Sequence, residues 1–207
     1  MTDYGRIHLT EEDMRERRYT RYLGGGEAQW DRRGAFQLEL LRELGLRADH
    51  GLLDFGCGPL RAGRFFVAYL NEGCYCGVDF NASFIEVARG TVQAEGLAGR
   101  RPRLEVVQDF DVASLRRKFD FVLAFSVLNH CSAAQRPLFF ARVASAMHTS
   151  SRLFVTHGAW FDAARVPTLP LRLLRQHVSS RASIYEHGWA PGETVYPVLE
   201  FGLGGAS

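Results

Sequence analysis

From residue 35 to residue 157, short apolar runs alternate with longer segments in which apolar residues recur every three or four positions. The runs have the length of buried strands and the longer segments have the spacing of amphipathic helices. The expected strands are 51–55, 75–80, 104–107, 119–125 and 152–156, and the expected helices are 31–44, 61–70, 81–96 and 132–147. Such alternation predicts an α/β fold with a doubly wound, mostly parallel sheet.

The last fifty residues extend this pattern less regularly. Residues 168–178 carry leucines and arginines at a spacing that favours a helix over one face of the sheet. Residues 184–189 and 194–201 are expected to form a final strand pair, with Pro197 at a bulge or an edge. A chain of 207 residues has the length of one domain, which we divide into an N-terminal arm or lid, 1–34, and a ligand-binding domain, 35–207.

Charge and composition exclude several classes of function. The 25 basic residues nearly match the 23 acidic ones and form no stripe interleaved with aromatics, so we expect no nucleic-acid partner. The charged N-terminal segment and the lack of a long apolar run predict a cytoplasmic protein without membrane contact. The four cysteines form no CxxC pair and the seven histidines show no HExxH spacing, so neither a disulfide framework nor a metal site is expected.

The sharpest motif follows the first expected strand. The segment Asp54-Phe55-Gly56-Cys57-Gly58 ends that strand, and Asp79 ends the next strand about twenty residues later. Two glycines let a ligand approach the backbone, and a carboxylate at the tip of the second strand can accept hydrogen bonds from both ribose hydroxyls. This arrangement predicts a nucleoside cofactor at the carboxyl ends of the strands. Leu60 stands where a dinucleotide site has its third glycine, so NAD and FAD fit poorly.

Four ordered motifs identify a family. LLDFGCG, GVDFN, VVQDFD and FDFVLAFSVLNH together resemble the class I methyltransferases that depend on S-adenosylmethionine (SAM), over residues 35 to 157. The stretches YLGGG, WDRRGAFQLELLRELGL and GCGPLRAG further resemble a subgroup of small bacterial methyltransferases, SAM-cyclising relatives included, with an arginine after the glycine loop. The resemblance implies a Rossmann-like class I fold, with seven mostly parallel strands, an antiparallel last strand and an N-terminal helical arm.

The resemblance also implies which residues hold SAM. The glycine loop would lie against the aminoacyl part of SAM, the carboxylate of the second strand would hold the ribose, and aromatic and acidic residues would surround the adenine. In order along the chain these residues are Gly56, Cys57 and Gly58 for the aminoacyl part, Asp79 for the ribose, Phe80, Asp109 and Phe110 for the adenine, and Phe125 and Ser126 for the methionine moiety.

Arg61 raises a separate question, because it is expected in the first turn of a helix. A cation there is disfavoured by the helix dipole by about 0.3 to 1 kcal/mol, which a nearby anion would offset. We expect Arg61 to pair with the carboxylate of SAM. The alternative is that its aliphatic part packs over the sheet edge while its guanidinium lies in water. Tyr22, with Tyr19 and Trp30, is expected either to cover the sulfonium as a lid or to anchor the arm by packing.

Catalytic residues are harder to assign. Asn129 and His130 follow the fourth expected strand, where His130 could act as a general base on a hydroxyl or amine, or simply bond a nearby carbonyl. Asp54 is expected to be structural, bonding loop amides beneath the cofactor. The resulting hypothesis is a SAM-dependent methyltransferase for oxygen or nitrogen of a small molecule. The alternatives are cleavage of SAM alone into methylthioadenosine and azetidine-2-carboxylate, and SAM binding without catalysis.

Overall fold

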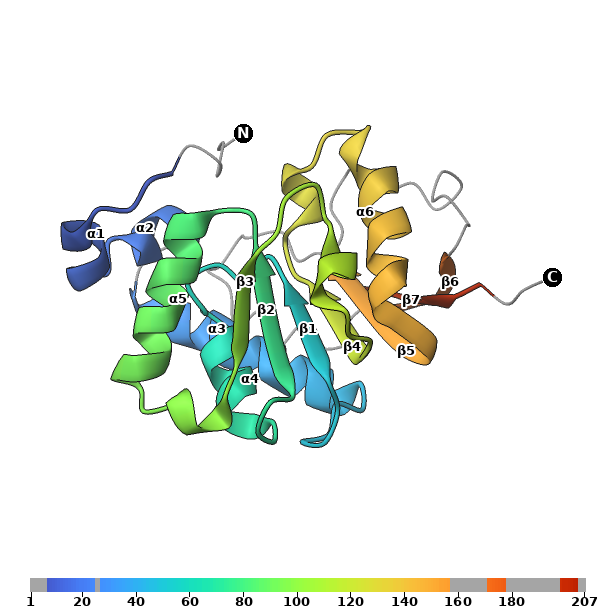
Figure 1. Ribbon diagram of the computed structural model, residues 1–207, viewed down its shortest axis with the longest axis horizontal. Coiled ribbons are helices and arrows are strands. Elements are labelled where there is room, and N and C mark those ends of the chain that lie inside the picture. Colours follow the sequence, from blue (N-terminus) through green and yellow to red (C-terminus); the bar gives the residue numbers. More distant parts are fainter. Residues whose placement is uncertain (1–6, 25–26, 157–170, 178–197, 205–207) are drawn as a thin grey trace.

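A seven-stranded sheet forms the centre of the protein, with its strands in the order β3-β2-β1-β4-β5-β7-β6 (Figure 1). The computed structural model describes residues 7–24, 27–156, 171–177 and 198–204. The strands are β1 (Leu52–Phe55), β2 (Tyr75–Asp79), β3 (Arg103–Val106), β4 (Phe119–Ala124), β5 (Met147–Thr156), β6 (Leu171–His177) and β7 (Val198–Leu203). This is the doubly wound, mostly parallel sheet that the alternating pattern predicts.

The direction of the strands changes only near one edge. The first five strands pair in parallel, with Leu53 opposite both Cys76 of β2 and Val122 of β4. β7 pairs antiparallel with β5 and with β6, so the prediction of an antiparallel last strand is confirmed. β2 and β4 lie on opposite sides of β1, so the strand order reverses at β1. α/β sheets bind ligands at such a switch point.

Helices cover both faces of the sheet. The longer helices are α3 (Glu27–Glu43), α4 (Gly63–Tyr69), α5 (Ala82–Ala94) and α6 (Gln135–Val143), and the short ones are α1 (Glu11–Arg15) and α2 (Tyr19–Gly24). On one face, Phe139 and Val143 of α6 join a core cluster with Phe119 and Leu153. On the other face, α3, α4 and α5 form a second cluster around Phe66, which is fully buried.

One expected element is wrong. Residues 168–178 are predicted as a helix, yet 171–177 form edge strand β6, paired with β7. The side chains of Leu171 and Leu173 turn toward the core cluster at a spacing of two, and a bulge between Leu173 and Arg175 leaves Leu174 outside. The leucines favour a helix locally, but pairing with β7 satisfies the backbone of a segment at the sheet edge. The expected strand 184–189 lies outside the described residues.

Helix boundaries largely follow their capping residues. Asn81 caps α5 as expected, because its side-chain oxygen accepts from the amides of Ser83 and Phe84. Ser132 and Gln135 form the predicted reciprocal capping bonds, and α6 begins at Gln135. α4 begins at Gly63, so Arg61 lies in the turn before the helix and not in its first turn.

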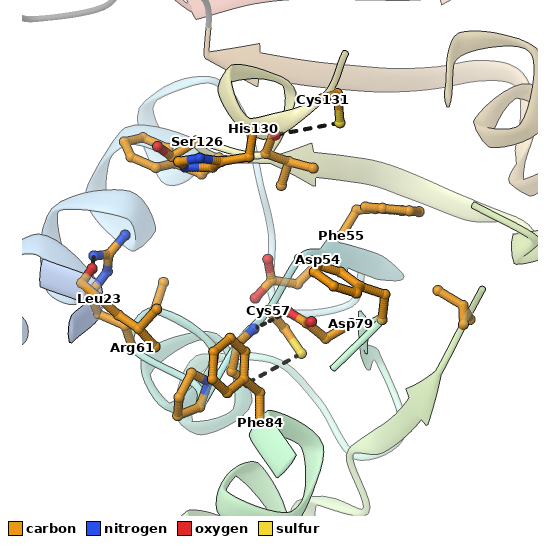
Figure 2. A pocket seen from close by; sticks show the side chains of 18 of the residues that line it. Leu23, Asp54, Phe55, Cys57, Arg61, Asp79, Phe84, Ser126, His130 and Cys131 are labelled. Atoms are coloured by element: carbon orange, nitrogen blue, oxygen red, sulfur yellow. Dashed lines mark hydrogen bonds between the residues drawn. The ribbon is translucent and has the colours of Figure 1, made fainter. Parts of the chain in front are cut away.

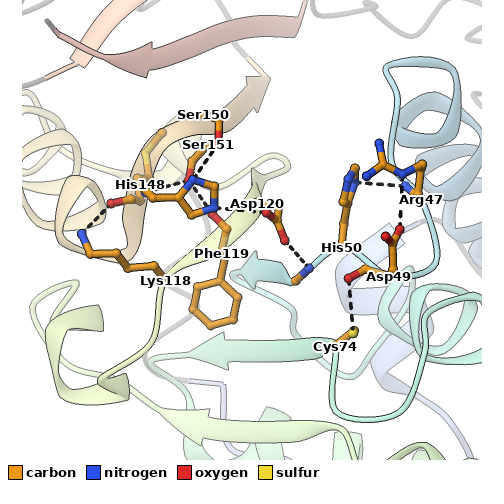
Figure 3. Close-up of polar contacts among 12 residues, drawn as sticks. Arg47, Asp49, His50, Cys74, Lys118, Phe119, Asp120, His148, Ser150 and Ser151 are labelled. Atoms are coloured by element: carbon orange, nitrogen blue, oxygen red, sulfur yellow. Dashed lines mark hydrogen bonds and ion pairs between the residues drawn. The ribbon is translucent and has the colours of Figure 1, made fainter.

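Two polar networks join strands at positions away from the glycine loop. At the amino ends of the strands, Asp120 accepts from the amide of Gly51 at 2.7 Å and contacts His148 at 3.1 Å (Figure 3). At the antiparallel edge, the buried Glu200 lies 2.7 Å from both Arg152 Nε and His177 Nε2. Burial raises the pKa of Glu200, but the hydrogen bonds from Arg152 and His177 lower it further, so its pKa lies below the ordinary value and the carboxylate stays charged.

The N-terminal arm packs against α5. Leu9, Tyr19 and Trp30 form a third apolar cluster with Phe84 and Val87 of α5. α3 runs from Glu27 to Glu43, so one helix crosses the boundary expected at residue 34. Among the residues that the structure describes, no helix combines the length and apolar character needed to cross a membrane.

Candidate functional site

A cavity of about 650 Å³ opens at the carboxyl ends of the parallel strands. This volume falls within the range of about 300–1,000 Å³ that is usual for small-molecule sites. The loops after β1, β2, β3 and β4 meet there, and the N-terminal arm and α3 close one side (Figure 2). The position agrees with the switch-point prediction, since the glycine loop after β1 forms part of the wall.

The glycine loop has the backbone that its residues predict. Gly56 and Gly58 have φ values of +75° and +54°. A Cβ on Gly56 would lie 2.5 Å from Cγ2 of Val127, so a larger residue would collide with the loop after β4. Leu60 also has a positive φ, +62°, and its side chain is fully buried. Dinucleotide-binding loops have glycine at this position, because a positive φ is unfavourable for leucine. Burial of the Leu60 side chain offsets that cost.

Asp79 lies where a ribose-binding carboxylate is expected. It is buried, and its oxygens accept hydrogen bonds from the amides of Gly58 at 3.0 Å and Asn81 at 2.9 Å. The backbone amide of Phe80 also hydrogen-bonds this carboxylate. Burial raises the pKa of Asp79, and the backbone amides oppose that rise.

Asp54 differs from its expected role. We predicted bonds to loop amides, but the loop amide of Gly58 bonds Asp79, and Asp54 instead accepts from the Tyr75 hydroxyl at 2.7 Å. Asp54 lines the cavity, and burial raises its pKa to about 7. Figure 2 shows its carboxylate directed into the cavity, near Asp79 and opposite Arg61. Asp54 is thus an ionisable group in the wall and not only a loop support.

The residues expected at the adenine all belong to the cavity wall. Phe80, Asp109 and Phe110 all line it, together with Gln108, whose side-chain amide donates to the carbonyl of Phe80 at 3.1 Å. Asp109 and Phe110 have positive φ values, +49° and +59°. Residues in this conformation are uncommon outside glycine and concentrate at binding sites. Phe80 is 49% exposed, so its ring is available to a flat ligand.

Arg61 connects the glycine loop to the arm. Its Nη1 donates to the carbonyl of Leu23 at 2.9 Å, and its guanidinium lies 5.6 Å from the ring centre of Trp30. Arg61, Leu23 and Trp30 all line the cavity. The guanidinium therefore lies in the cavity wall, between the glycine loop and the arm.

The arm forms one wall of the cavity through residues other than the expected tyrosine. Leu23 and Trp30 contribute to the lining, while the Tyr22 side chain lies outside the described residues. Tyr19 packs edge-on against Trp30, with ring centres 5.5 Å apart, and this supports the packing interpretation of that aromatic pair. The side-chain amide of Asn81 donates to the carbonyl of Ile7 at 2.8 Å, which fixes the start of the arm beside Asp79.

The loop after β4 supplies the opposite wall. Phe125, Ser126 and His130 line the cavity, and the amide of Ser126 donates to the hydroxyl of Thr156 at 2.6 Å. Asn129 is not among the lining residues. Burial lowers the pKa of His130, which keeps its imidazole neutral near pH 7 and able to accept a proton. Burial raises the pKa of the Cys57 thiol, so Cys57 contributes an uncharged wall.

Sequence reasoning missed two polar residues of α3. Arg33 and Gln37 are both buried and both line the cavity. They lie one helical turn apart, between apolar residues such as Phe36 that face the sheet. That spacing is the signal that could have found them, because buried polar residues on the apolar face of a helix need partners or a ligand.

Comparisons with known proteins agree with this geometry. Residues 53–153 match a family model described as a methyltransferase domain. A TehB-like SAM-dependent methyltransferase from Corynebacterium glutamicum superposes with a TM-score of 0.62 at 18% identity, covering 93% of this chain and 97% of the other. No curated protein sequence matches the chain.

Two further solved structures resemble more than nine-tenths of the chain. Magnesium protoporphyrin IX methyltransferase from Synechocystis, with S-adenosylhomocysteine (SAH) bound, has a TM-score of 0.62 at 18% identity and covers 91% and 93% of the two chains. A SAM-dependent methyltransferase from Clostridium acetobutylicum has a TM-score of 0.60 at 12% identity, with 95% and 100% covered. The fold is that of the class I methyltransferases. Residues 53–153 thus match a methyltransferase domain, and the fold is the class I methyltransferase fold that the four motifs predict.

Proposed function

We propose that the protein binds SAM in this cavity and transfers its methyl group to an oxygen or nitrogen of a small molecule. The observation that carries the proposal is the buried Asp79 carboxylate, bonded to the glycine-loop amide at the switch point of a class I methyltransferase fold. Support for a small acceptor comes from the arm, because Leu23 and Trp30 form a wall over a cavity of about 650 Å³. A bulky macromolecular acceptor would have to enter past that wall.

The transfer places modest chemical demands on the protein. A lone pair of the acceptor forms a bond to the methyl carbon while the carbon–sulfur bond breaks and its electrons pass to sulfur. The sulfonium becomes the neutral thioether of SAH, and the acceptor loses a proton. Alignment of the acceptor with the methyl group supplies most of the acceleration, and a base helps where the acceptor is a poor nucleophile.

A direct test is incubation of the purified protein with SAM, alone and with a panel of phenols, carboxylic acids and amines. We expect SAM to bind and SAH to form only when an acceptor is present, as measured by mass spectrometry. Methylthioadenosine from SAM alone would instead show intramolecular cleavage, and binding without any turnover would show a SAM-binding protein. Failure to bind SAM at all would contradict the assignment of the cavity.

His130 is the candidate general base of this proposal. Changing His130→Gln is expected to lower kcat about 100-fold with the acceptor found in the panel, because a neutral histidine in the wall can take the acceptor's proton. The Kd for SAM should change less than about twofold. His148→Gln, at the amino ends of the strands, is the matched control and should retain full kcat. An unchanged kcat in the His130 variant would show that His130 is not the general base.

Arg61 is the candidate partner of the SAM carboxylate. Arg61→Ala is expected to weaken SAM binding about tenfold, because a charge-assisted hydrogen bond is lost. Calorimetry with methylthioadenosine, which lacks the carboxylate, separates this role from the contact with Leu23. Equal losses for SAM and methylthioadenosine would show that Arg61 acts only through the arm.

A further inference from the structure

A buried tyrosine and aspartate lie directly beneath the glycine loop. The Tyr75 hydroxyl donates to Asp54 at 2.7 Å, and both residues are almost fully buried. Tyr75 opens β2 opposite Leu52, while Asp54 lies two residues further along β1, opposite Gly77. The tyrosine side chain therefore extends along the sheet to reach the carboxyl.

Two glycines make room for this contact. A Cβ on Gly77 would lie 2.9 Å from the Tyr75 hydroxyl oxygen, and a Cβ on Gly63, the first residue of α4, would lie 2.3 Å from it. Side chains at either position would displace the hydroxyl from Asp54. The Tyr75 ring also stacks on Phe66, with ring centres 6.4 Å apart, which fixes its plane.

We propose that Tyr75 is a positioning residue for cofactor binding: its hydroxyl holds the Asp54 carboxyl in the cavity wall so that the carboxyl receives the ammonium group of SAM. The proposal rests on the proposed function, since it assumes SAM in the cavity. Its geometric basis is the direction of Asp54 into the cavity beside the glycine loop, where the aminoacyl end of SAM is expected (Figure 2).

The titratable and charged groups near Asp54 are Tyr75, Asp79, Arg61, Cys57 and Cys76. Arg33 and His130 line the same cavity. Burial raises the pKa of Asp54 to about 7, the Tyr75 hydrogen bond lowers it, Asp79 raises it, and Arg61 lowers it. Below that pH the free carboxyl is protonated, so binding an ammonium must release a proton.

This linkage gives a defined pH profile. The Kd for SAH, which carries the same ammonium, should rise about tenfold per pH unit below pH 7 and level off above it. The deaminated analogue of SAH, which keeps the carboxylate and lacks only the ammonium, should not weaken as the pH falls. Calorimetry between about pH 5.5 and pH 8.5 measures both ligands on the same protein.

Tyr75→Phe is the decisive variant. Removing the hydroxyl removes a bond that favours the charged carboxyl, so the midpoint of the SAH profile should move up by about one pH unit. At pH 7 the Kd should rise about fivefold and at pH 6 about tenfold, with less than a twofold change at pH 8.5. Tyr69→Phe is the matched control, because the Tyr69 hydroxyl bonds the carbonyl of Leu46 instead, and it should leave the profile unchanged.

Two further variants keep the proposal falsifiable if Tyr75→Phe folds poorly. Asp54→Asn cannot titrate, so its SAH affinity should become independent of pH in this range. His130→Gln should keep the wild-type profile. A pH profile that persists in Asp54→Asn, or disappears in His130→Gln, would overturn the proposal while leaving SAM binding intact. Absence of SAH binding at every pH would instead contradict the proposed function.

Discussion

The Asp79→Ala variant is expected to bind SAM about 1,000-fold more weakly than the wild-type protein. In the proposed complex Asp79 accepts from two ribose hydroxyls, and hydrogen bonds to a charged group contribute about 1.5–3 kcal/mol each. The same carboxylate accepts from the amides of Gly58 and Asn81, so its removal also releases the glycine loop. Isothermal titration calorimetry or equilibrium dialysis with SAM gives the ratio of the two Kd values.

Two comparisons isolate the role of this carboxylate. Asp79→Asn keeps the shape and loses the charge, so it should fall between the wild-type protein and Asp79→Ala. Asp49→Ala removes an exposed aspartate whose ion pair with Arg47 lies outside the cavity, and it should bind SAM normally. If Asp79→Ala bound SAM as tightly as Asp49→Ala while remaining folded by circular dichroism, the ribose would not be held at β2 and the proposed site would be wrong.

Gly34→Ala is expected to destabilise the protein by about 3 kcal/mol or more. A Cβ at Gly34 of α3 would lie 2.1 Å from the carbonyl oxygen of Arg61 and 2.7 Å from the ring of Phe65. The first neighbour is backbone, which cannot rotate away, so α3 and the Arg61 turn must separate. Thermal unfolding should show a fall in Tm of about 6 to 12 °C for a chain of this size. SAM binding should weaken as well, because that turn carries the glycine loop.

Gly90→Ala provides the matched control. Gly90 lies inside α5, and a Cβ there would have no neighbour within 4 Å. Alanine in an open helix interior is favoured over glycine by about 0.5–1 kcal/mol, so Gly90→Ala should raise Tm slightly. The same substitution thus has opposite expected signs in two helices. A rise in Tm for Gly34→Ala would show that α3 does not pack against the Arg61 turn as closely as the structure indicates.

Prediction from sequence succeeded where the signal is local and strong. The five parallel strands, the cap at Asn81 and the antiparallel β7 were all predicted, because apolar periodicity and capping residues act over a few positions. It failed at β6, where leucines with high helix propensity form a strand. The pairing with β7 decided that conformation, and no residue inside 171–177 encodes its partner.

The residues of the candidate site also fall into those predicted from local motifs and those that depend on contacts between distant segments. The glycine loop, Asp79 and Asp109 were predicted from motifs, and the structure brings them together around one cavity. Arg33 and Gln37 were missed, because a polar pair on a helix indicates no ligand until the facing element is known. Asp54 was predicted to bond loop amides, and its actual partner, Tyr75, is 21 positions away in sequence.

The amino-acid sequence alone determined the alternation of the first five strands with helices, the loop that turns at Gly56 and Gly58, and the carboxylate that ends the second strand. These features depend on backbone freedom, apolar periodicity and spacing, and each of these is a property of residues that are close together in the sequence. The tertiary structure alone decided that Arg61 bonds the arm at Leu23, that Tyr75 holds Asp54, and that 171–177 is a strand. Each of these contacts joins segments far apart in the chain, and its energy exists only once the sheet has brought them together.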